Sequence, residues 1–341
     1  MSGVPAALTE RPSAARAVAV LALVAVGALI PLLGPRVALD GTGEAAAPGV
    51  WGIALLRTVL FAALCVPAGE LFVAGLARGV PGAPREAPRS WAPYAAAAGF
   101  VAALSLASVV ATGNLVPRSP SDIDIGGLYE TRDGKLALLE VNAFAAVGLC
   151  ALSRRPATQV WPLAAIAVAE ALRAHPATEQ GPLLGSGLTL VHLVCASLWV
   201  GGLLHVLRTL RHWRTTEAGA VLPGAGAVLS GAGAALLGLY ARVAAVLLAA
   251  VTATGAWSTL RRMPPDTVVE QLTATAYGRA LLAKVLLVAV VAVLALAARV
   301  RLGRARDPLG ACAPARAEVA VLGVVVAVSA LLTALPVPIR W

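Results

Sequence analysis

The sequence has very little charge for its length. Of its 341 residues only 13% are charged, whereas 59% are hydrophobic and the mean hydropathy is +0.83. A soluble domain would carry roughly a quarter charged residues, so this chain cannot cover a water-facing surface and must have lipid as its solvent. The net charge of +10 does not indicate nucleic-acid binding, because the basic residues lie in short clusters between apolar runs, as topology signals do.

Sulfur-containing residues are also scarce. The chain has only two methionines, Met1 and Met263, so a ladder of thioether ligands cannot be built. Its cysteines form no CxxC pair and indicate no disulfide framework. No catalytic triad, phosphate-binding loop or pair of catalytic acids appears, and we expect the chain not to be an enzyme. The cysteines lie far apart, mostly within apolar runs, and are expected to be buried free thiols: Cys65, Cys150, Cys195 and Cys312.

Long apolar runs are what the sequence does contain. About 20 apolar residues cross a hydrocarbon core of roughly 30 Å, and this criterion predicts an all-α integral membrane protein with about nine transmembrane helices. Arg11 and Arg16 precede the first span, which we expect to remain as an uncleaved helix, the alternative being a signal peptide cut near residues 45–47. The predicted spans are residues 17–34, 51–77, 92–113, 136–153, 158–174, 187–207, 236–259, 279–299 and 317–336.

The basic residues of the connecting segments predict the orientation. Alternate connections carry 15 and 8 Lys and Arg residues respectively. The richer set faces the cytoplasm by the positive-inside rule. This places the N-terminus inside and the C-terminus outside the bacterial cytoplasmic membrane.

Two stretches of sequence recur in the same order, which predicts an internal repeat. Residues 111–113 and 253–255 both read Ala-Thr-Gly, near the ends of the third and seventh spans. Residues 131–135 and 275–279 both have a Thr-x-x-Gly pattern followed by a basic residue. Four spans separate the copies, so both would insert in the same orientation, as in transporters built from parallel repeats. We therefore predict a tail, leading helix and outer loop over 1–50, a first four-helix repeat over 51–178 and a second over 179–341.

Candidate metal ligands gather around the predicted outer end of the sixth span. His192, Cys195 and Trp199 are spaced to share one helical face. Imidazole and thiolate both suit copper, and the softer thiolate favours Cu(I). His175 precedes the span across a short outer turn, and Glu170 lies just before it, so both could join one outer site. The alternatives are a hydrogen-bonded interfacial histidine and a cysteine that packs as a small apolar residue.

Three further intramembrane positions indicate structural interactions. Lys284 occupies the repeat position that matches Glu140, and we predict an ion pair between them near the pseudo-symmetry axis, with a transport role as the alternative. Glu70 lies deep in the second span, and a hydrogen-bonded, protonated acid is one interpretation of it.

Four segments carry a family resemblance: the His…Trp-Val-Gly-Gly string at 192–202, residues 240–255, residues 275–284 and Arg-Ala-Glu at 316–318. Together they resemble the copper resistance protein D (CopD) family of bacterial membrane proteins over about residues 186–336. The resemblance implies a multi-helix permease that takes up copper from a periplasmic or extracellular copper-binding partner. It also implies that His192 and His175 are ligands. His175 lies in Ala-His-Pro where the family often has Gly-His-Ala, and Cys195 replaces a residue that is usually small and apolar.

These observations lead us to expect a permease that moves copper ions, as Cu(I) or Cu(II), across the bacterial cytoplasmic membrane, with import as the expected direction. The expected site contains His192, His175, Cys195 and Glu170. A membrane scaffold that holds copper for the assembly of a metalloenzyme such as an oxidase is one alternative. A haem-binding electron carrier with His175 and His192 as axial ligands is another.

Overall fold

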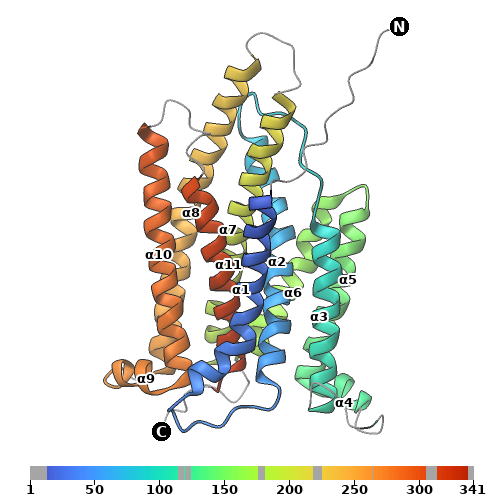
Figure 1. Ribbon diagram of the computed structural model, residues 1–341. Coiled ribbons are helices and arrows are strands. Elements are labelled where there is room, and N and C mark those ends of the chain that lie inside the picture. The colour runs from blue at the N-terminus through green and yellow to red at the C-terminus, as the bar shows by residue number, and fades with distance from the viewer. Residues whose placement is uncertain are drawn as a thin grey trace.

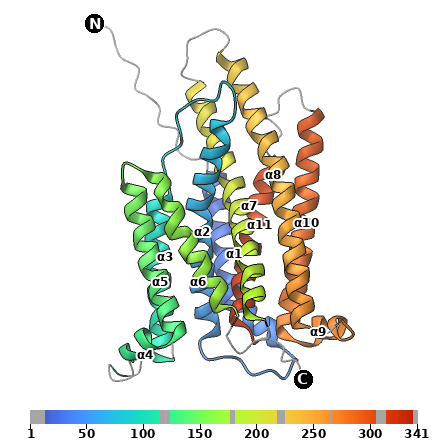
Figure 2. The ribbon, with the colours of Figure 1, turned by 180° about the vertical axis from the view of Figure 1, so that it is seen from behind.

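The computed structural model describes residues 14–113, 119, 124–175, 181–217, 225–263, 265–304 and 313–336. In these ranges every regular element is helical, so the all-α prediction is confirmed. The predicted tail before residue 14 and Cys312 lie outside the described residues. Figures 1 and 2 show the long helices side by side in one bundle, with α4 and α9 at the same end. The helices are α1 (Ala14–Leu39), α2 (Val50–Arg78), α3 (Ala92–Thr112), α4 (Ile125–Glu130), α5 (Arg132–Leu152), η2 (Pro156–Gln159), α6 (Val160–Arg173), α7 (Pro182–Glu217), α8 (Ala225–Arg262), α9 (Val268–Ala274), α10 (Ala276–Arg304) and α11 (Ala313–Ala334).

Seven helices in the described part are long and apolar enough to cross a membrane, namely α2, α3, α5, α7, α8, α10 and α11. Their outward faces expose large apolar side chains such as Leu149, Val246 and Val293, as expected for a surface in contact with lipid. Helix α1 is apolar over Ala25–Leu39, and α6 has only 14 residues. The chain is therefore a multi-pass membrane protein. Each of the nine predicted spans coincides with a helix, while a count of nine crossings stays a prediction.

Helices α2 and α7 cross in contact at the centre of the bundle. Both run from the end that carries α4 and α9 towards the opposite end (Figure 1). A methyl group added to Gly69 would overlap the backbone of Gly201, and one added to Gly201 would overlap the carbonyl oxygen of Cys65. Only glycine allows two helix backbones to approach this closely. The crossing lies between the two predicted repeats, because α2 begins the first and α7 begins the second.

The two predicted repeats share a local arrangement where a short helix meets a long one. Thr131, between α4 and α5, accepts a hydrogen bond at Oγ1 from the Gly134 N–H at 3.0 Å. Thr275, between α9 and α10, accepts one from the Gly278 N–H, also at 3.0 Å. A side chain on either glycine would overlap the backbone of the preceding short helix. The same turn at matching positions supports the predicted repeat.

The other repeated stretch has different structures in its two copies. Gly113 ends α3 in a left-handed conformation, with φ of 68°. Its counterpart Gly255 lies within α8, which continues to Arg262. The recurring Ala-Thr-Gly therefore ends its helix in the first copy only. The extra turns of α8 bring Arg262 to the end of the bundle that carries α9.

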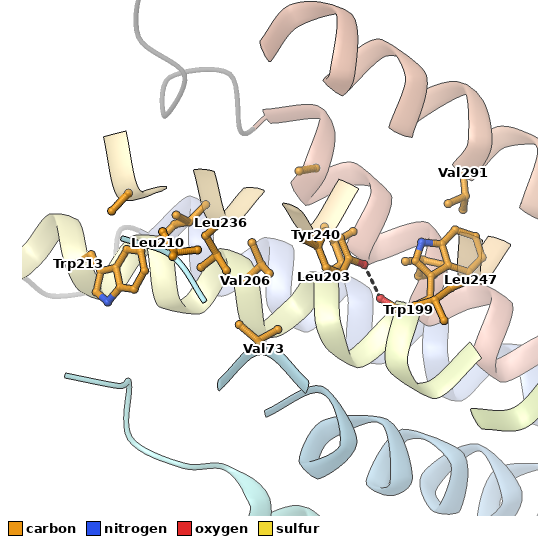
Figure 3. Packing of buried hydrophobic residues seen from close by; sticks show 14 of the residues in the cluster. Val73, Trp199, Leu203, Val206, Leu210, Trp213, Leu236, Tyr240, Leu247 and Val291 are labelled. Carbon is orange, nitrogen blue, oxygen red and sulfur yellow. Dashed lines mark hydrogen bonds between the residues drawn. The ribbon is translucent and has the colours of Figure 1, made fainter. Parts of the chain in front are cut away.

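The half of the bundle away from α9 contains a large hydrophobic cluster along α7. Trp199, Leu203 and Val206 pack there against Leu236 and Tyr240 of α8 (Figure 3). The Tyr240 hydroxyl donates to the carbonyl oxygen of Trp199 at 2.7 Å. This hydrogen bond satisfies a buried phenol and ties α8 to α7.

Glu70 connects α2, α7 and the segment before α3. Its carboxylate accepts from the Ser90 hydroxyl at 2.5 Å, the Trp91 backbone N–H at 2.7 Å and the Arg208 guanidinium at 3.0 Å. The Arg208 guanidinium also lies 3.6 Å from the centroid of the Trp91 ring. Glu70 therefore has a structural role, because its hydrogen bonds hold α2, α7 and the segment before α3 together. The Arg208 guanidinium balances its negative charge.

Candidate functional site

A polar cavity of about 370 Å³ opens among α2, α6, α7, α8, α10 and α11. Its wall includes Ala174 at the end of α6, Arg262 at the end of α8 and Tyr277 at the start of α10. These helix ends lie on the same side of the bundle as α9 (Figure 2). The positive-inside pattern predicts this side to be external, and we call this space the outer cavity.

His192 of α7 lines the outer cavity and is oriented by α8. Its Nδ1 lies 3.0 Å from the Thr254 Oγ1, and that hydroxyl donates to the Ala250 carbonyl oxygen at 2.7 Å. Because the threonine proton is used in this way, the hydrogen-bond network assigns Nδ1 as the donor and leaves a lone pair on Nε2. A neutral imidazole fixed through one nitrogen is the form in which histidine binds metals.

His175 lies outside the cavity wall. It is 3% exposed, its Nε2 is 2.9 Å from the Thr189 Oγ1, and its ring packs against the backbone at Gly185. Thr189 lines the outer cavity one helical turn before His192. The structure thus places His175 behind Thr189 and not beside His192 in the cavity.

Glu170 lines the outer cavity but its carboxylate binds two arginines. Arg57 of α2 approaches it at 2.6 Å and Arg173 of α6 at 3.2 Å. Arg173 also contacts Glu140 of α5 at 2.9 Å. This network joins α2, α5 and α6, and its members are at most 14% exposed.

The Glu140 carboxylate therefore binds Arg173, on the adjacent helix of its own predicted repeat. Lys284 of α10 lines the outer cavity and makes no ion pair among the described residues. The structure does not bring Glu140 and Lys284 together as a pair. A repeat position fixes the helix and the depth of a residue, but not which neighbouring helix supplies its partner.

Replacing Arg173 with methionine should destabilise the protein by about 3 kcal/mol, because breaking a buried pair leaves an uncompensated charge. Glu140, which is 1% exposed, would lose its ion-pair partner. The check is thermal unfolding in detergent. Lys135→Met is the matched control, because Lys135 is exposed at the start of α5, and it should leave the transition unchanged. Adding Glu140→Gln to Arg173→Met should restore part of the lost stability. If the double variant is no more stable than Arg173→Met, the assigned pair between Arg173 and Glu140 is contradicted.

A second cavity of about 180 Å³ continues from the first into the bundle. Both are lined by Glu170, Thr189, His192 and Lys284, among others. The deeper one is mostly apolar and is also lined by Cys65 of α2. We call it the middle cavity. His192 and Cys65 therefore line the same cavity.

Cys195 has different surroundings from those predicted. It packs against the hydrophobic cluster around Trp199 and lines neither the outer nor the middle cavity. Cys65 takes its place as the thiol near His192. The sequence offered one signal for this position. Cys65 lies one helical turn before Gly69, and Ser197 lies one turn before Gly201. In the structure, both Cys65 and Ser197 line the middle cavity.

A third cavity, of about 230 Å³, follows along α7 towards the opposite end. Trp199 lines both this inner cavity and the middle one. Tyr240 of α8, Arg299 of α10 and Glu318 of α11 also line it. Three cavities therefore lie in series through the bundle, with the Trp199 ring at the boundary between the second and third.

Within the described ranges, no group of three or more His, Cys, Asp and Glu side chains could hold a metal ion. The four predicted ligands are divided among three surroundings: His192 and Glu170 at the cavity, His175 behind Thr189, and Cys195 in the hydrophobic cluster. The sequence analysis did not include three cavity-lining residues among the candidate site residues: Arg57, Cys65 and Arg262. An arginine within an apolar span was the available signal for Arg57.

Comparison with known protein families gives one match. Residues 234–332, from α8 through α11, match the family model of copper resistance protein D. His192 and His175 lie outside the matched segment, so the match does not extend to their roles. Comparisons with curated proteins and with solved structures found no match. The match supports a resemblance to the copper resistance protein D family over this segment of a multi-pass helical membrane protein.

Proposed function

We propose that this protein carries copper ions across the bacterial cytoplasmic membrane, inwards from the outer cavity. The family is related to copper resistance and transport, which supports copper as the substrate. The observation that carries the proposal is the position of His192, whose ring lines both the outer and the middle cavity. An ion that leaves the outer cavity for the interior would pass this imidazole.

The ligands along the path suit copper. The Nε2 lone pair of His192 meets the ion first, and the Cys65 thiol lies in the middle cavity beyond it. Imidazole and thiolate are both copper ligands, and the thiolate favours Cu(I). A transported ion needs sites that bind it well enough to enter and weakly enough to leave. Two successive ligands, without a three-ligand cage in the part of the chain that the structure describes, meet that requirement.

Replacing Cys65 with serine should reduce Cu(I) uptake about tenfold, because a soft ligand is exchanged for a hard one of similar size. Such a loss corresponds to about 1.4 kcal/mol. Uptake can be measured in proteoliposomes that contain a Cu(I) indicator. Cys150→Ser is the matched control, since Cys150 of α5 lines neither cavity, and Cys195→Ser should also retain uptake. Equal loss in all three variants would contradict a role for Cys65.

The same proteoliposomes test the function itself. Wild-type protein should raise copper uptake above that of protein-free liposomes, in a saturable manner, whereas a scaffold that only holds copper would bind it without accumulation in the lumen. Addition of a copper-binding protein from the periplasm or the extracellular space tests the proposed source.

No structural observation favours haem, because the His175 ring contacts Thr189 and lines neither the outer nor the middle cavity.

A further inference from the structure

The outer cavity has a large excess of positive charge. Four cationic side chains line it, Arg57, Arg173, Arg262 and Lys284, against the single carboxylate of Glu170. The Glu140 carboxylate behind Arg173 lowers the excess from three charges to two. Charge of one sign in a cleft with low-dielectric walls concentrates ions of the opposite sign. The net charge of this cavity therefore favours an anion.

The cationic groups of the cavity also have unused hydrogen-bond donors. Nε of Arg57, and Nε and Nη2 of Arg173, are buried without a hydrogen-bond partner in the described part of the chain. Lys284 has no carboxylate partner there, and Arg262 donates to the Tyr277 hydroxyl at 3.0 Å instead of pairing with an acid. Buried donors of this kind are rare, because each costs free energy when it is left unpaired.

The remaining polar wall consists of hydroxyl groups from several helices. Three of them donate their proton to a backbone carbonyl oxygen, so their oxygens can accept from a ligand hydroxyl. The hydroxyl groups are those of Thr189, Ser258, Thr259, Ser329 and Thr333.

We propose that the outer cavity binds a soluble, multiply charged oxyanion of the size of a small polycarboxylate. Guanidinium groups match the oxygen pairs of carboxylates and phosphates, and the cavity is lined by Arg57, Arg173 and Arg262. Its volume of about 370 Å³ falls within the range of pockets that hold small organic molecules, which is more than a monatomic ion requires. Its position among helix ends favours a ligand from water over a lipid headgroup. The proposal goes beyond copper transport and stands or falls separately from it.

Calorimetric titration of the copper-free protein in detergent tests this site. The probes are citrate, inorganic phosphate and phosphatidylglycerol. We expect citrate to bind, with an affinity that falls as salt concentration rises. Lys284→Gln and Arg262→Gln should each weaken citrate binding at least about tenfold, because each removes a charged hydrogen-bond donor. Lys135→Gln, which removes an exposed charge on the same side of the bundle, should bind citrate as the wild type does.

Thermal unfolding separates binding from folding in these variants. Since Lys284 has no ion-pair partner among the described residues, its replacement should leave the unfolding temperature without citrate unchanged or raised. Absence of citrate binding by the wild type, binding of phosphatidylglycerol alone, or equal weakening by Lys135→Gln would each overturn the proposal. None of these outcomes depends on copper transport, which the proteoliposome assay measures separately.

Discussion

Copper uptake should fall to the level of protein-free liposomes when His192 is replaced by alanine. His192 is the only histidine whose ring lines both the outer and the middle cavity in the described structure. Its removal takes away the first lone pair that an entering ion meets, and the remaining outer wall is cationic. The measurement is the initial rate of copper uptake into proteoliposomes, compared at equal amounts of reconstituted protein.

The control for this variant must separate a lost ligand from a lost structural contact. His192→Asn retains a side-chain donor for the Thr254 hydroxyl but places no imidazole lone pair in the cavity. It should therefore fold normally and still fail to transport copper. His175→Gln should affect folding more than uptake, because His175 is 3% exposed and packs behind Thr189. Normal uptake by both His192 variants would refute the proposed route.

Gly201→Ala should destabilise the protein by about 3 kcal/mol or more, although it adds a single methyl group. That methyl would occupy the position of the Cys65 carbonyl oxygen, so α2 and α7 would have to separate. Overpacking in a well-packed core typically costs about 1–3 kcal/mol, and contact with a backbone atom cannot be relieved by a rotamer change. The check is the unfolding temperature in detergent, together with the yield of monodisperse protein.

Gly187→Ala is the matched control for this prediction. Gly187 lies on the same helix, and nothing is within 4 Å of the position of its added methyl group. Alanine there should be neutral or slightly stabilising, because it favours the helix more than glycine does. Gly69→Ala should resemble Gly201→Ala, since it tests the same crossing from α2. Similar stability for the Gly187 and Gly201 variants would show that the two helices do not meet as described.

The sequence predicted the helices well, because a membrane span requires a long apolar run and little else. All nine predicted spans fall on helices, including the two around Pro156, where η2 leads into α6. The repeat predicted from the sequence rests partly on Thr131 and Thr275, and the two residues make the same turn in the structure. The number of residues in each helix was harder to predict, because α7 and α8 continue beyond their apolar cores.

The site was only partly predictable, because its residues come from six helices. Helical spacing placed His192 and Trp199 on α7 correctly, but it cannot identify the neighbouring helices of a side chain. The partner of Glu140 depends on how α5 packs against α6, and the approach of Cys65 depends on the glycine crossing of α2 and α7. Such contacts are properties of packing between distant segments, which a single sequence does not encode locally.

The indole of Trp199 has a consequence for the rate at which ions can cross. It bounds both the middle and the inner cavity, and its backbone carbonyl is held by the Tyr240 hydroxyl, so the helix itself is fixed at this level. If the ring closes the passage between the two cavities, copper on this route advances only when the ring swings aside, one event for each ion. Flux would then saturate at modest concentrations and rise steeply with temperature, as in a carrier and unlike an open pore.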